Sequence, residues 1–137
     1  MSDYCYSRLT CRLKDAFRFS AIGYHLEELV DNDCIAMVDE QADFGHSDEL
    51  EELAGEGPIF YGYSANGDEY PAEVFAADGV EYASCDTIVP DANPALEMYE
   101  DGTIVGQQEA SDYWRVWNSA RKKLIDAGES PAVNTIG

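Results

Sequence analysis

The 137-residue sequence predicts an α+β fold: a single compact domain over residues 1–137, with a mostly antiparallel β-sheet built as a hairpin meander and with helices packed on one face. Asn66-Gly67, Asp78-Gly79 and Asp101-Gly102 are turn dipeptides of the type that closes tight hairpins. Apolar residues alternate over short segments, but they recur at helical spacing near the end of the chain. No long linker rich in Ser, Pro or Gly divides the sequence, so we expect one core.

The amino-terminal segment, residues 3–13, alternates between two kinds of side chain. Cysteine, serine and leucine occupy one side, and tyrosine, arginine and threonine occupy the other, which predicts a strand. A helical interpretation, with Cys5, Leu9 and Leu13 in register, stays open.

Two further elements are predicted before residue 40. Ser20 suits the N-cap of a helix over residues 21–31, and His25 falls on the apolar face of that helix, where we expect a core side chain. Residues 34–38 form a short apolar run that follows a polar turn, and this run predicts a second strand.

Residues 47–57 predict a strongly acidic helix. Ser47 suits the N-cap, and acidic residues follow in the first turn, where the helix dipole favours them. Leu50, Leu53 and Ala54 form an apolar stripe. Like charges four residues apart on the other side each cost about 0.2–0.5 kcal/mol, so stability alone does not explain them. The acids on that side are Asp48, Glu49, Glu51, Glu52 and Glu56.

The three turn dipeptides lie between strands of the predicted meander. These strands are residues 59–64, 70–77, 80–85, 96–100 and 103–107. The last predicted element is a helix over residues 109–127, whose apolar stripe should pack on the sheet. Its basic residues Arg121, Lys122 and Lys123 suit the negative end of the helix dipole, and a functional basic patch is the alternative.

Chemical motifs are scarce in this sequence. The cysteines contain no C-x-x-C pair, so we expect free, mostly buried thiols whose pKa values are raised by the surrounding acids. The sequence gives no catalytic residue, no cofactor motif and no metal site. Because no apolar run suits a signal peptide or a membrane span, we expect a cytoplasmic protein, in the host cytoplasm if a phage encodes it. The cysteines are Cys5, Cys11, Cys34 and Cys85.

The charge of the chain is distributed unevenly. Asp and Glu number 28 and Lys and Arg number 8, which gives a net charge of −20. Residues 19–114 contain no Lys or Arg, and since only four acids lie outside this segment, 24 lie inside it. Direct binding to nucleic acid or to an anionic membrane is excluded, because both need a basic surface. Spread over about half of the protein surface, this charge would approach the density of duplex DNA, which carries one charge per ~1.7 Å of axis.

This distribution predicts a non-enzymatic inhibitor that imitates a nucleic acid and blocks the DNA- or RNA-binding surface of a basic protein or complex. The inhibitors that phages and mobile elements use against restriction enzymes and CRISPR complexes resemble the chain in size and charge. The expected partner is therefore a defence effector or a nuclease. Two alternatives stay open: an immunity protein of a nuclease toxin, and a salt-adapted, halophilic protein whose acidity is not functional. The oligomeric state is not specified by the sequence.

Three groups of residues are candidates for partner binding. The first group consists of the five acids of the helix predicted at 47–57. The second combines acids with tyrosines of the hairpin region, because tyrosine is enriched at interface hot spots, although these tyrosines could equally form one plain face of the sheet. Its members are Asp68, Glu69, Glu73, Tyr61, Tyr63 and Tyr70. The third group lies in the loop expected before the helix and comprises Asp39, Glu40 and Asp43.

Overall fold

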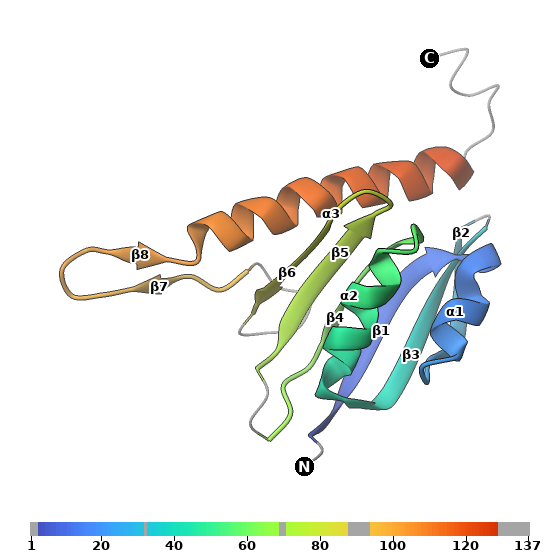
Figure 1. Cartoon of the computed structure of the whole chain (residues 1–137), viewed down its shortest axis with the longest axis horizontal. Helices are drawn as coiled ribbons and strands as arrows, with labels where there is room; N and C mark the ends of the chain where they lie inside the picture. The colour runs from blue at the N-terminus through green and yellow to red at the C-terminus, as the bar shows by residue number, and fades with distance from the viewer. Residues whose placement is uncertain (1–2, 32, 69–70, 88–93, 129–137) are drawn as a thin grey trace.

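The computed structural model describes residues 3–31, 33–68, 71–87 and 94–128. These residues form a six-stranded sheet of order β2-β3-β1-β4-β5-β6, in which every neighbouring pair is antiparallel (Figure 1). The predicted α+β class with a mostly antiparallel sheet in a single compact domain is confirmed. The strands are β1 (Tyr4–Arg12), β2 (His25–Asp31), β3 (Cys34–Asp43), β4 (Ile59–Ser64), β5 (Glu73–Asp78) and β6 (Tyr82–Asp86).

Helices and a small second sheet complete the described part of the chain. A separate hairpin of β7 (Glu97–Met98) and β8 (Ile104–Val105) projects from the main sheet (Figure 1). The α-helices are α1 (Ala16–Ser20), α2 (Ser47–Ala54) and α3 (Gln107–Gly128), and single 3₁₀ turns, η1 (Leu13–Asp15) and η2 (Phe44–His46), precede α1 and α2.

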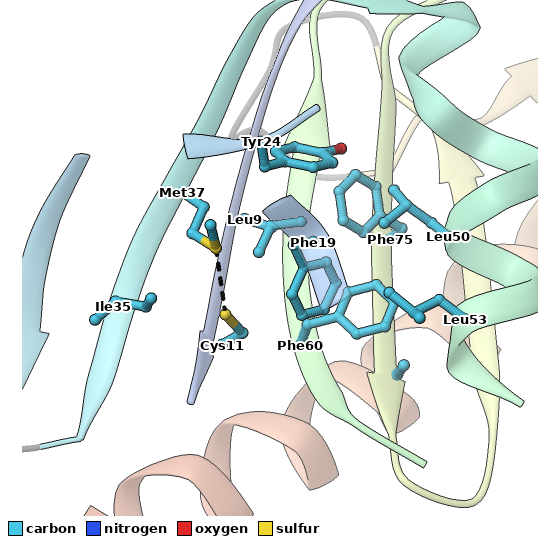
Figure 2. Close-up of a cluster of buried hydrophobic side chains, with 11 residues drawn as sticks. Leu9, Cys11, Phe19, Tyr24, Ile35, Met37, Leu50, Leu53, Phe60 and Phe75 are labelled. Atoms are coloured by element: carbon cyan, nitrogen blue, oxygen red, sulfur yellow. Dashed lines mark hydrogen bonds between the residues drawn. The ribbon is translucent and has the colours of Figure 1, made fainter. Parts of the chain in front are cut away.

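The helices cover both faces of the sheet, which corrects the expectation that they share one face. On the first face, Leu50 of α2 and Phe19 of α1 pack with Phe60 and Phe75 of the sheet (Figure 2). On the second face, α3 packs against the alternate residues of the same strands. Both faces are covered because β4 and β5 carry apolar residues at consecutive positions, so each side of the sheet needs a partner layer.

The amino-terminal half contains two correct strand predictions and one wrong helix prediction. The strand expected at 3–13 is β1, and the strand expected at 34–38 is the first half of a longer β3. The helix expected at 21–31 is wrong, because residues His25–Asp31 form the edge strand β2, in which every residue is exposed. His25 is accordingly an exposed side chain and not a core one. Gly23, at φ +126°, separates α1 from this strand with a conformation that a helix does not use.

The later elements largely follow the prediction. The acidic helix is α2, but Ser47 is its first helical residue, and His46, at φ 57°, occupies the N-cap position. Gly79 and Gly102 take positive φ values in the predicted turns between β5 and β6 and between β7 and β8. Asn66-Gly67 lies instead in the longer connection over residues 65–72, so this turn is not tight. The carboxy-terminal helix is confirmed as α3.

Candidate partner-binding surface

Helix α2 presents a row of carboxylates to solvent. Leu50 and Leu53 are buried and fix the helix on the sheet, so the opposite side of the helix faces outward. Among the described residues, the exposed acids of this side have no cationic partner within ion-pair distance. We call this set the α2 stripe; it consists of Asp48, Glu49, Glu51 and Glu52.

Glu56, the fifth acid of the first predicted group, has a different environment. Its Oε1 accepts a hydrogen bond from Nη1 of Arg18 at 2.7 Å. The same arginine lies 3.4 Å from a carboxylate oxygen of Asp15. Glu56 therefore forms part of a mixed-charge cluster and does not extend the uncompensated charge of the stripe.

The sheet brings further acids to the end at which α2 begins. The register pairs Tyr4 with Asp43 and Ser64 with Glu73, so the start of β1, the end of β3, the end of β4 and the start of β5 lie together (Figure 1). We call the acids at this end the acidic corner. They are Asp3, Asp39, Glu40, Asp43, Asp68 and Glu73.

Backbone hydrogen bonds hold part of the acidic corner in place. The amide of Asp3 donates to Oδ1 of Asp43 at 3.0 Å, and the amide of Asp68 donates to Oδ1 of Asp3 at 2.7 Å. Three segments that are distant in the sequence are thereby tied together through carboxylates. The acids at 39, 40 and 43 belong to strand β3, which corrects the expectation that they lie in a loop.

Both histidines of the chain bind acids of this corner. Nε2 of the mostly buried His46 lies 2.7 Å from Oδ2 of Asp39, and Nε2 of the exposed His25 lies 2.7 Å from Oε1 of Glu40. The hydrogen bond to Glu40 raises the pKa of His25 above its usual value. Protonation of His25 would therefore reduce the negative charge of the corner as the pH falls.

The four thiols have raised pKa values, with burial as the largest cause and nearby acids as a smaller one. Burial raises the pKa of Cys5, and Asp3, Glu73 and Asp39 raise it further. Burial raises the pKa of Cys11 to about 12, with a smaller contribution from a nearby acid. The pKa values of the other two cysteines are also raised, and all four thiols are free. None of these thiols has the lowered pKa that an activated nucleophile needs.

Several basic residues lie at the end of the sheet opposite the acidic corner. Arg12 ends β1 at the opposite end of the sheet, where its Nη2 lies 3.4 Å from the backbone oxygen of Lys123. Nζ of Lys123 donates to the backbone oxygen of Asp78 at 2.9 Å, at the far end of β5. Arg115 pairs with Glu81 just before β6 begins. Basic residues from the two ends of the chain, Arg12 and Lys123, thus meet in space at the end of the sheet opposite the acidic corner.

The second predicted group combined tyrosines of the hairpin region with Asp68, Glu69 and Glu73, and the structure places Asp68 and Glu73 in the acidic corner but the described tyrosines elsewhere. Tyr61 and Tyr63 lie on the opposite face of the sheet, beside α3, where the Tyr61 ring contacts Trp117 edge-on at 5.9 Å between centroids. With Trp114 they line a groove that is described further below. Glu69 and Tyr70 lie outside the described residues.

Sequence reasoning did not single out Asp3 or the pairing of Asp39 with His46. Asp3 acts through backbone hydrogen bonds that have no sequence signature, and the histidine pair depends on a sharp left-handed turn at Gly45 and His46. Within the described residues, no group of three or more His, Cys, Asp and Glu side chains could hold a metal ion. In the same part of the chain, no helix has the length and apolar character that crossing a bilayer requires.

No protein-family model matches the chain, no curated protein matches its sequence, and no solved structure matches its fold.

Proposed function

We propose that the protein is a non-enzymatic inhibitor that imitates a nucleic acid and occupies the DNA- or RNA-binding surface of a basic protein or complex. The proposed targets are defence effectors such as CRISPR complexes and restriction enzymes, which makes a phage or mobile-element origin the natural setting. The α2 stripe and the acidic corner are the proposed contact surface. The observation that carries the proposal is the segregation of charge, with these acids at one end of the molecule and Arg12 and Lys123 at the opposite end of the sheet.

The spacing of the α2 stripe supports this proposal. Four carboxylates lie within five consecutive residues, and a helix rises about 1.5 Å per residue, so the stripe carries about one charge per 1.9 Å of axis. Duplex DNA carries one charge per ~1.7 Å. A basic groove that recognises phosphates would therefore meet a similar linear charge density on this helix.

The rigid mounting of the stripe also supports the proposal. Leu50 is fully buried and Leu53 is nearly so, and both pack with the aromatic residues of the first core (Figure 2). A helix fixed in this way presents its charges with little further loss of conformational entropy on binding. Fast association with a strong dependence on salt is the expected behaviour of such a surface.

A competition assay tests the proposal. A panel of purified CRISPR effector complexes, restriction endonucleases and nuclease toxins is incubated with fluorescent duplex or guide-matched DNA, and the chain is titrated in. Displacement of DNA from a panel member, weakening as salt rises, supports the proposal. Displacement confined to a nuclease toxin would instead indicate an immunity protein, and no displacement from any member at low salt would refute the proposal.

Matched variants locate the contact surface. The triple variant Asp48→Lys, Glu51→Lys, Glu52→Lys is expected to bind at least tenfold more weakly, which corresponds to about 1.4 kcal/mol or more. The control variant Asp31→Lys, Asp33→Lys, Glu100→Lys makes the same change in net charge at exposed acids outside the proposed surface. Equal losses in the two variants would show that net charge alone drives binding and would remove the α2 stripe as the site.

A further inference from the structure

The β7–β8 hairpin exposes apolar side chains that the rest of the molecule does not cover. It forms a two-stranded sheet of its own and extends beyond the main sheet (Figure 1). Met98, at 71% exposure, pairs across the hairpin with Ile104, at 37%. An isolated two-stranded hairpin is marginally stable in water, so contact with another surface would stabilise it.

The two faces of this hairpin have different surroundings. Glu97 and Val105 pair across the hairpin and line a hollow together with Cys85 of β6. Since side chains alternate along a strand, Met98 and Ile104 belong to the opposite face, and Val105 is itself 45% exposed. All charged residues within 96–105 are acidic. The hairpin therefore presents exposed apolar side chains with acids beside them and at its tip.

A groove of complementary character runs between α3 and β1. Tyr61 and Tyr63 of β4 and Trp114 and Trp117 of α3 line it, and Thr10 lies on its β1 side. Its volume is about 240 Å³. Aromatic side chains at such density are typical of surfaces that anchor apolar groups.

Positive charge borders this groove, although the chain as a whole is strongly acidic. The Arg121 guanidinium lies 5.5 Å from the centre of the Trp117 ring, and Arg12 lies on the same side of β1 as Thr10. In the described part of the chain, neither arginine has a carboxylate within ion-pair distance, whereas Arg8, Arg18 and Arg115 are all paired. The groove is thus lined by Arg8, which is paired with Glu27 and Glu28, while Arg121, without an acidic partner among the described residues, lies over the Trp117 ring at its side.

We infer that the β7–β8 hairpin of one copy of the chain docks into the α3–β1 groove of a second copy. The hairpin is apolar and acidic and the groove is aromatic and basic, so the two surfaces are complementary in both respects. They are different surfaces of the molecule, so the contact is head-to-tail and leads to a ring or an open chain of subunits. The inference is independent of the proposed function, since the α2 stripe lies on the other face of the sheet.

Analytical ultracentrifugation of the full chain tests this inference. The contact is small, and interfaces below about 1,200 Å² are weak, so concentrations up to about 0.5 mM are needed. The hairpin variant is Met98→Ser with Ile104→Ser, and the groove variant is Arg121→Glu. Their matched controls are Val80→Ser, at an exposed residue outside the hairpin, and Lys122→Glu, at the neighbouring base of α3.

The expected result is association of the wild-type chain and of both controls, and monomeric hairpin and groove variants. An equimolar mixture of the hairpin and groove variants should form a dimer and stop there, because only one intact hairpin and one intact groove remain per pair. The two tryptophans of the chain both line the groove, so their fluorescence should change as the dimer forms. A monomeric wild-type chain at 0.5 mM, or a mixture that does not associate, would overturn the inference.

Discussion

Replacing Glu52 with lysine is expected to stabilise the protein while it weakens the proposed partner binding. Glu52 lies four residues after Asp48 on α2, so the two acids form a like-charged pair on the helix, whereas Glu56 lies beyond the end of the helix at Ala54. The like-charged pair costs about 0.2–0.5 kcal/mol and an unlike pair gains a similar amount, so reversing it gives roughly 0.4–1 kcal/mol. The value should be about 0.5 kcal/mol, because both positions are exposed.

Urea unfolding at low salt measures this gain, and Glu51→Lys is the matched control. Glu51 has Ser47 and Gly55 at the positions four residues away, and its remaining acidic neighbour on the same side is Asp48, three residues before it. The control should therefore gain clearly less stability, and the difference between the variants should shrink in about 1 M salt, where charges are screened within ~3 Å. Equal stabilities of the two variants, or destabilisation by Glu52→Lys, would refute the charge-repulsion reasoning for α2.

Three further outcomes are expected. Gly62→Ala should lower the unfolding free energy by about 3 kcal/mol or more, because the new Cβ would lie 2.1 Å from a backbone oxygen of β1. The control Gly55→Ala, at the end of α2, should change the unfolding free energy by less than about 1 kcal/mol, and urea denaturation of both variants measures the difference. The pKa of His25 measured by NMR should lie above its usual value, and Glu40→Gln should abolish this shift. Because the pKa of His25 is higher in the folded protein than in the unfolded chain, the protonated side chain adds stability below the unfolded-state pKa, and this stability is lost as the pH rises through the folded-state pKa. Unfolding should be cooperative in about 0.1 M salt with little gain in multimolar salt, and a chain that folds only at high salt would support the salt-adapted alternative.

The elements that pack against the core were predictable from the sequence, and the edge strand was not. The alternation in β1 and the helical spacing in α3 are visible because half of each element is buried. In β2, Leu26 and Leu29 are exposed by 58% and 65%, so their spacing reflects no buried helix face. Pairing with β3 decides the conformation of this segment, and that pairing is a long-range interaction.

The candidate site was predictable only in part, for a related reason. The α2 stripe follows from local spacing alone, since burial of Leu50 and Leu53 turns the intervening acids outward. The positions of Tyr61 and Tyr63 depend on which face of the sheet each helix covers, and nothing local specifies that choice. Gathering Asp3, Asp43 and Asp68 at one corner required the strand registers and the backbone hydrogen bonds between distant segments.

The sequence by itself determined the amount of charge, the base-free segment of residues 19–114 and the acidic helix within it. Only the tertiary structure decided that Arg12 lies beside Lys123, while Asp3 before β1 and acids from β3, the β4–β5 connection, the start of β5 and α2 share the opposite end. The physical reason is that antiparallel pairing fixes which strand ends lie together, and composition carries no information about that direction. A chain with a net charge of −20 therefore becomes a molecule with an acidic end and a separate aromatic, basic groove.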